Sequence, residues 1–209
     1  MSQNLGKIEK PSVEGFGMGR KLYFVPLVFS PRDPEVDLLE IIKRYWEQVE
    51  AHVSNLEEKL GNVRKIYHEL VPEGGEDGAE AIEELDEGSY KIVKVRLDKG
   101  AELQSIEDAE LLTEFMDWSR CLAIGLQNDK VFIKVFEFYT EAQKKRNDYL
   151  SKSIDDTLED GEIGMLLMRE GHQVQFPPDI EVFYIAPPGL DEIRRWLRAR
   201  EDETQSGSS

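Results

Sequence analysis

The sequence has few of the residues that stabilise small secreted proteins or anchor a chain in a membrane. It contains one cysteine, Cys121, so no disulfide can form within the chain. No apolar run approaches the roughly 20 residues that a membrane span needs. The first twenty residues also lack the apolar core of a secretory signal. Together these absences predict a cytoplasmic protein that does not bind membranes.

Positive charge is also scarce. The chain has 26 Lys and Arg against 43 Asp and Glu, which gives a formal net charge of −17. Proteins that bind nucleic acid without sequence preference rely on many contacts from Lys and Arg to phosphates. The overall charge therefore argues against nucleic-acid partners, except through a local basic patch, and against anionic membrane surfaces.

Motifs for metal binding and nucleophilic catalysis are missing. The only three histidines are His52, His68 and His172, and no two of them have the spacing of zinc ligands. No Gly-x-Ser-x-Gly nucleophile motif is present. We therefore predict no metal, no cofactor and no catalytic residue, and we consider an enzyme less well supported than a binding protein.

Two of the histidines are nevertheless candidates for contact with a ligand. His172 follows the expected turn at Glu170 and Gly171, where backbone and imidazole could meet a ligand; the alternative is a plain surface residue. His68 precedes Glu69 on an expected strand, so their side chains should point to opposite faces of the sheet.

The apolar content is high enough for a folded core, with 40% hydrophobic residues and a full set of aromatics. The order of patterns predicts an α+β or α/β fold, in which a mixed sheet is packed by two long helices and followed by a C-terminal β-β-α segment. We expect a flexible arm (1–20), an N-terminal α+β subdomain (21–128), a C-terminal subdomain (129–201) and a disordered tail (202–209).

Alternation and β-branched content predict six strands, at 22–29, 63–70, 90–97, 163–168, 172–176 and 180–186. Pro26 lies inside the first, which favours an edge position or a bulge. The last has apolar residues on both faces, which is typical of a central strand. Helices are expected at 34–60, 79–85, 105–122, 130–158 and 190–200. Of these, the helices at 79–85 and 105–122 are expected to have Asp77 as N-cap and Asp108 at the third position.

The helix at 34–60 has a seven-residue apolar repeat. It consists of Leu39, Ile42, Trp46, Val49, Val53, Leu56 and Leu60. Neighbouring apolar residues widen this face, which favours a helix packed on a sheet. The alternative is a coiled-coil seam, through which a protein partner or a second copy of the chain would bind at Leu39–Leu60.

An acidic stretch from Glu73 to Gly88 contains eight Asp and Glu and no Lys or Arg. Most charge blocks of this kind are solvated, and we expect a surface loop that leads into a short helix. A docking surface for a basic partner and a weak divalent-cation site are the alternatives. The ligand frame of an EF-hand is absent.

The expected C-terminal helix has a cluster of arginines around a tryptophan. Arg194, Arg195, Trp196 and Arg198 form the candidate partner-binding patch, because Arg beside Trp is typical of interfaces and of nucleic-acid contacts. The alternative is that these arginines only complement the helix dipole, since Asp191 and Glu192 begin the same helix.

The segment from about residue 139 to residue 200 resembles a known domain. A long helix, the run Leu158-Glu159-Asp160-Gly161-Glu162-Ile163 into the apolar strand, a later strand and a final helix look like the C-terminal, ribosomal-protein-L30-like domain of archaeal and eukaryotic peptide-chain release factors and their Pelota relatives. Such release factors use a Gly-Gly-Gln loop, whereas this chain has Gly74-Gly75-Glu76. The resemblance therefore implies a bacterial-type relative without demonstrated release activity and transfers no catalytic residue.

Three functions follow from these observations. The first is a non-enzymatic protein-interaction module. The second is a translation-associated, release-factor-like protein that lacks the Gly-Gly-Gln loop. The third is a hydrolase that uses carboxylates near His68 or His172.

Overall fold

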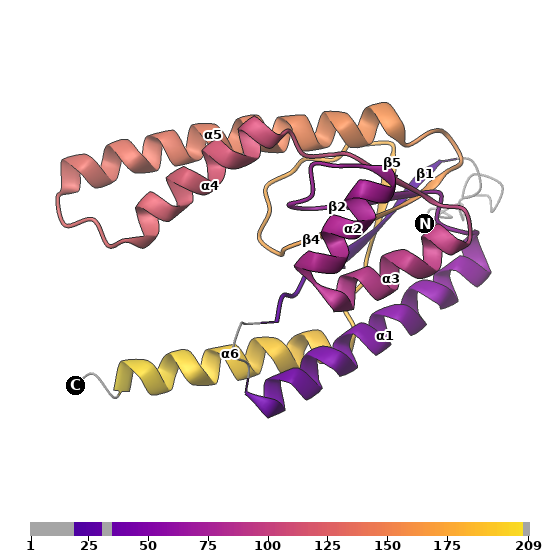
Figure 1. Cartoon of the computed structure of the whole chain (residues 1–209), viewed down its shortest axis with the longest axis horizontal. Helices are drawn as coiled ribbons and strands as arrows, with labels where there is room; N and C mark the ends of the chain where they lie inside the picture. The colour runs from indigo at the N-terminus through magenta and orange to yellow at the C-terminus, as the bar shows by residue number, and fades with distance from the viewer. Residues whose placement is uncertain (1–18, 31–34, 207–209) are drawn as a thin grey trace, which may run out of the picture.

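Five parallel strands form the centre of the molecule, in the order β3-β2-β4-β1-β5 (Figure 1). The computed structural model describes residues 19–30 and 35–206. The strands are β1 (Arg20–Pro26), β2 (Lys65–His68), β3 (Glu102–Gln104), β4 (Ile163–Met168) and β5 (Ile180–Tyr184). Each pair of neighbours is parallel. The fold is therefore α/β, and the prediction of a mixed sheet was wrong.

Helices cover both faces of this sheet. They are α1 (Val36–Leu60), α2 (Gly75–Leu85), α3 (Glu87–Asp98), α4 (Ala109–Ala123), α5 (Asp129–Thr157) and α6 (Pro188–Ser206). One core cluster joins the sheet to α1, α2, α3 and α6, and a second joins the other face to α5. α4 packs along α5 as a hairpin that extends beyond the strands (Figure 1).

β1 occupies an inner position of the sheet, between β4 and β5, although it contains Pro26. The Lys21 N–H donates to the Glu162 carbonyl just before β4, and the Leu27 N–H donates to Met168 of β4. The backbone groups of the even-numbered residues of β1 therefore face β5. On that side, the Ile185 N–H, just after β5, donates to the Phe24 carbonyl, two residues before Pro26. The missing N–H of Pro26 therefore faces no ladder partner, and the prediction of an edge strand was wrong.

β5 is the edge strand instead. It pairs with β1 alone, and Val182 and Tyr184 are exposed. The predicted central position was wrong, because apolar residues on both faces do not by themselves show that both faces are covered. Residues 172–176 form no strand, and β4 and β5 are parallel with β1 between them, so no hairpin forms at Gly171.

The acidic stretch is mostly helical. α2 begins at Gly75, so Asp77 lies in its first turn and Gly74 is its N-cap, contrary to the predicted loop and cap. The strand predicted at 90–97 is α3, whose N-cap Asp86 accepts a 2.6 Å hydrogen bond from the Ser89 N–H. Capping and helix packing thus outweigh the strand preference of the β-branched residues.

α1 is the predicted long helix, and its apolar repeat belongs to the core. Ile42, Trp46, Val49 and Val53 are buried, whereas Leu39 and Leu60 at its two ends are exposed. The inner part of the predicted seam is therefore covered by the chain itself. Pro34, the expected first residue of the helix, lies outside the described residues, as does most of the expected arm.

The remaining helices depart from prediction mainly at their ends. Asp108 is the N-cap of α4 and accepts hydrogen bonds from the Glu110 and Leu111 N–H groups; it does not occupy the third helical position. α6 continues through Ser206, so the tail predicted from 202 is helical as far as that residue. β4 and β5 pair with β1 and β2, so the predicted subdomains 21–128 and 129–201 share one sheet.

Gly88, in the first turn of α3, lies directly against Trp46 of α1. A Cβ at this position would overlap the Trp46 indole ring. We expect Gly88→Ala to lower the free energy of unfolding by about 1–3 kcal/mol in urea, because overpacking outweighs the helix preference of Ala. Adding Trp46→Leu should cancel part of that loss. A Gly88→Ala variant as stable as the wild type would contradict this packing.

Candidate functional site

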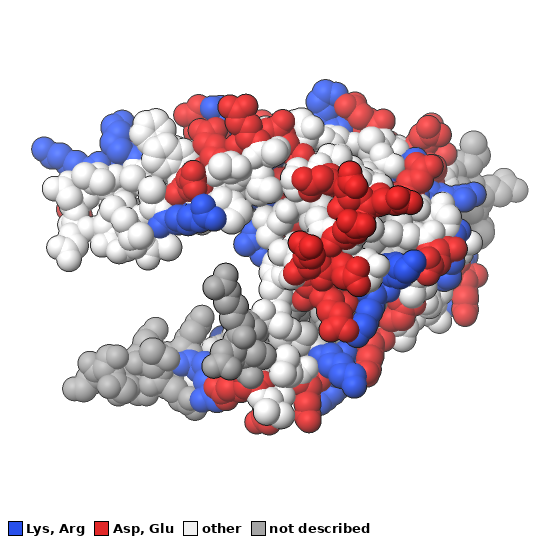
Figure 2. Space-filling model, viewed as in Figure 1, with Lys and Arg blue, Asp and Glu red and all other residues white. Residues whose placement is uncertain are grey.

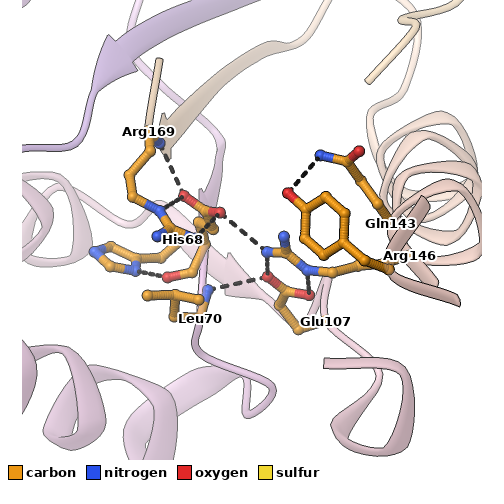
Figure 3. A network of polar contacts seen from close by, with 8 residues as sticks. His68, Leu70, Glu107, Gln143, Arg146 and Arg169 are labelled. Atoms are coloured by element: carbon orange, nitrogen blue, oxygen red, sulfur yellow. Dashed lines mark hydrogen bonds and ion pairs between the residues drawn. The ribbon is translucent and has the colours of Figure 1, made fainter. Parts of the chain in front are cut away.

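Four charged side chains meet at the carboxyl ends of the strands. Glu69 directly follows β2, Arg169 directly follows β4, Glu107 lies shortly after β3, and Arg146 projects from α5 (Figure 3). In open parallel sheets, ligands bind outside the carboxyl ends of the strands. This cluster therefore occupies the part of the fold where a site is expected.

Arg146 lies between the two carboxylates. Its Nε donates to Glu107 Oε2 at 2.9 Å, and its Nη2 donates to Glu69 Oε1 at 3.1 Å and also to Glu107 Oε1. Arg169 binds Glu69 with its backbone N–H, its Nε and its Nη2, at 2.8 to 3.1 Å. The side chains of Arg146, Glu69 and Glu107 are at most 4% exposed. The cluster thus holds three buried charges in bidentate geometry.

The charges of the cluster stabilise one another. Burial would raise the pKa of Glu69, but the hydrogen bonds and charge of Arg169, with the charge of Arg146, outweigh burial and hold that pKa below its usual range. Burial would lower the pKa of Arg146, but its hydrogen bonds to Glu107 and Glu69 and the charges of these two carboxylates outweigh burial and raise that pKa above its usual value. Glu69 accepts four hydrogen bonds, so its lone pairs are occupied and it is not free to act as a general base.

Leu70 connects the cluster to the backbone. It has a φ of 71°, the left-handed conformation that residues other than glycine rarely adopt. In this conformation its N–H donates to Glu107 Oε1 at 3.0 Å. A residue held in this conformation costs about 1–3 kcal/mol of stability, and such residues are concentrated at functional sites.

A pocket of about 230 Å³ opens beside the cluster. Its walls come from the base of the α4–α5 hairpin and from the segment after β4. Its lining includes Phe115, Ser119 and Tyr139 from the two helices of the hairpin, together with Arg146, Arg169 and His172. Arg146 also lies over the ring of Phe115, 4.9 Å from its centroid. The pocket therefore combines aromatic walls with guanidinium groups.

His172, one of the two predicted ligand contacts, lines this pocket. Its ring packs against Phe24, with 4.8 Å between centroids and the two planes tilted by 35°. Burial lowers its pKa, and the charge of Glu69 opposes that change only in part. Its Nδ1 is buried and has no hydrogen-bond partner among the described residues.

His68, the other predicted contact, lies on the opposite face of the sheet. It is 1% exposed, its Nδ1 is 2.6 Å from the Glu69 carbonyl oxygen, and its Nε2 is 3.3 Å from Ser89 Oγ. Burial lowers its pKa to about 4. His68 and Glu69 do point to opposite faces, as expected, and the structure does not bring His68 and His172 together.

The residues of the predicted arginine patch make different kinds of contact. Arg194 donates to Glu170 at 3.0 Å and to Asp191 at 2.7 Å, which ties α6 to the segment after β4. Arg195 and Arg198 bond only backbone carbonyls of α6 within the described part of the chain. Trp196 is partly buried against the core. The patch is thus part structural and part exposed.

The hairpin exposes a large apolar surface. We define the overhang as Phe132, Ile133 and Phe136 on α5 with Ile124 before it; these side chains are 45% to 74% exposed. Leu150 and Ile154 follow Phe132 and Phe136 by about five helical turns, so they share one face of the helix. At its C-terminal half that face packs on the sheet.

The overhang exists because α5 is longer than the sheet. Its 29 residues span about 43 Å, whereas strands of five or six residues span about 20 Å. Phe138 of α5, which is also 45% exposed, stacks on Trp118 of α4 with 4.8 Å between centroids, so that contact lies within the hairpin itself. The core-facing stripe of α5 therefore continues past the sheet without cover from the described residues.

The charge around the overhang differs from the rest of the surface. Acidic side chains gather over α2, whereas Lys and Arg border the hollow between the hairpin and α6 (Figure 2). Residues 119–136 have three basic side chains, Arg120, Lys130 and Lys134, and one acidic one, Asp129. Arg120 and Lys134 pair with exposed carboxylates of their own helices, contacts of little net strength. Lys130 makes no ion pair within the described structure.

In residues 19–30 and 35–206, no three His, Cys, Asp or Glu side chains could hold a metal ion, and no helix is long and apolar enough to cross a membrane. Comparisons with protein-family models, with curated proteins and with solved structures find no match for the chain. Function must therefore be inferred from geometry.

The sequence-based prediction missed the ion cluster and the overhang. One signal for the cluster was present: Ala142, Arg146, Leu150 and Ile154 recur every four residues, which places an arginine in the buried stripe of a helix. A buried arginine requires carboxylate partners. The overhang had no such signal, because the length of a helix beyond a sheet depends on where the strands end.

Proposed function

We propose that this protein is a non-enzymatic protein-interaction module that binds its partner with the overhang. The observation that supports this most strongly is the exposure of Phe132, Ile133 and Phe136 on the face of α5 that is buried further along the helix. Soluble proteins seldom leave a continuous apolar surface of this kind uncovered, and such surfaces mark interaction sites. A helix that is apolar on nearly all sides needs a neighbour on nearly all sides.

The charges favour a particular partner, an amphipathic segment with an apolar face and acidic flanks. Lys130 borders the overhang, and Arg195 and Arg198 lie on the helix across the hollow; none of the three forms an ion pair among the described residues. Acidic flanks would be attracted to them, and the strongly acidic remainder of the surface would repel the same segment elsewhere. Amphipathic helices that lie in apolar grooves are a common form of recognition.

The other two functions receive less support. A hydrolase would need a base beside a nucleophile, whereas Glu69 is fully hydrogen-bonded and His68 is enclosed on the far face. His172 lines the pocket with an unpartnered Nδ1, but the described structure gives it no hydrogen bond to a nucleophile. The release-factor relationship has no further observation in its favour. The seam at Leu39–Leu60 remains a weaker candidate surface, since its inner residues are buried in the core.

We expect the double variant Phe132→Ser, Phe136→Ser to bind an acidic amphipathic helical peptide at least tenfold more weakly than the wild type, because it removes two central aromatic contacts. The probe is a fluorescein-labelled peptide with a Leu and Phe face and Glu flanks, followed by anisotropy. The same peptide with Lys flanks should bind the wild type more weakly. The preference for Glu should shrink as salt is added.

Tyr149→Ser is the matched control, because Tyr149 is an exposed aromatic residue of α5 outside the overhang. It should leave binding of the peptide unchanged. The proposal fails if the double variant binds as tightly as the wild type, or if both peptides bind equally at low salt. It is also overturned if sedimentation shows a wild-type dimer that the double variant abolishes, since the occupant would then be a second copy of the chain.

A further inference from the structure

The pocket beside the ion cluster has unused hydrogen-bond donors. Arg146 uses Nε and Nη2, and Arg169 uses Nε and Nη2, so the Nη1 group of each makes no hydrogen bond within the described structure. Both residues line the pocket, and the Arg146 side chain is 96% buried. Neither Nη1 group is a buried orphan, so solvent reaches both, and each can donate a hydrogen bond to a ligand in the pocket that brings an acceptor.

The charges of the site are already balanced. Arg146 and Arg169 face Glu69 and Glu107, and Glu170 at the pocket wall is paired with Arg194. An anion entering the pocket would lose its hydration and find no uncompensated positive charge. The acceptor that fits is therefore an uncharged oxygen, such as the carbonyl of an amide.

His172 provides the complementary group. Its imidazole lines the pocket, and its buried Nδ1 has no partner in the described part of the chain. The neutral imidazole has one nitrogen that accepts a hydrogen bond, and the N–H of an amide can supply it. Phe115 and Tyr139 add aromatic surface against which a planar group can stack.

We infer that this pocket binds a small, planar, uncharged amide or lactam, with its carbonyl oxygen at the guanidinium groups of Arg146 and Arg169 and its N–H at the His172 imidazole. A volume of about 230 Å³ suits a single ring of this class. The site is separate from the overhang, and it joins the base of the hairpin to the carboxyl edge of the sheet. It is therefore independent of the proposed partner-binding function.

The test compares uncharged and charged probes of the same shape. Benzamide, uracil, benzoate and inorganic phosphate are titrated into the isotope-labelled full chain, and the backbone N–H signals of Gly171 and His172 are followed by NMR. We expect benzamide and uracil to shift these signals with dissociation constants in the low-millimolar range or below. Benzoate should bind at least tenfold more weakly than benzamide, although it has the same ring.

Two variants of α4 locate the binding. Ser119→Phe fills the pocket without removing an ion pair, and it should weaken benzamide binding at least tenfold. Thr113→Phe places the same ring on the exposed side of α4 and should leave binding unchanged. The inference is overturned if benzoate or phosphate binds as tightly as benzamide, if neither amide shifts the Gly171 and His172 signals, or if binding survives Ser119→Phe.

Discussion

Replacing Arg146 by Met should lower the free energy of unfolding by about 3–5 kcal/mol, the usual loss when one partner of a buried ion pair is removed. The variant leaves the buried Glu107 carboxylate with only the Leu70 N–H, and it leaves Glu69 with Arg169 alone. Urea unfolding followed by circular dichroism measures the loss. If the midpoint falls while the m-value stays at its wild-type value, the free energy of unfolding has changed and the surface exposed on unfolding has not.

Lys145→Met is the matched control for this prediction. Lys145 is the neighbouring residue on α5, and its pair with Glu141 is exposed, so its removal should change stability by less than about 1 kcal/mol. Adding Glu107→Gln to Arg146→Met should recover part of the loss, because it removes the uncompensated charge. A loss below about 1 kcal/mol for Arg146→Met alone would show that the cluster does not stabilise the fold.

His68 should make the protein less stable in mild acid. Burial lowers its pKa from the usual 6.5 to about 4, so the unfolded chain binds a proton more readily than the folded chain between these values. The contribution of His68 is therefore fully present above pH 6.5 and is lost as pH falls towards 4. A shift of this size corresponds to roughly 3 kcal/mol. Urea midpoints measured between pH 7 and pH 4 would show the decline.

Two histidine variants separate His68 from other titrating groups. His68→Gln should be less stable at pH 7 and should lose much of the decline between pH 6.5 and 4. His52→Gln changes an exposed histidine and should leave the decline unchanged. His172 contributes in the same direction, since burial also lowers its pKa. The explanation is wrong if His68→Gln shows the same pH dependence as the wild type.

A second buried arginine shows why local patterns misjudged part of the chain. Arg96 is fully buried and pairs with Glu57 at 3.2 Å and with Glu50, both on α1. The β-branched residues around it led to the prediction of a strand at 90–97. Local preference could not detect that α3 packs on α1, where a helix brings Arg96 to these carboxylates.

Only part of the candidate site could be predicted from the sequence. His172 was recognised from the glycine turn before it, and it does line the pocket. Its partners in that pocket come from α4, α5 and the ends of two strands, which are far apart in the chain. No spacing rule connects Glu69, Glu107, Arg146 and Arg169, because the order of strands in the sheet brings them together.

The amino-acid sequence alone determined the acidic surface, the exclusion of disulfides and most of the helices, since these depend on composition and on contacts between residues a few positions apart. The tertiary structure decided which strand lies at the edge, that the sheet is parallel throughout, and where the core-facing stripe of α5 loses its cover. These properties depend on pairing between distant segments, and a local pattern of polar and apolar residues is the same whether or not a neighbour covers it.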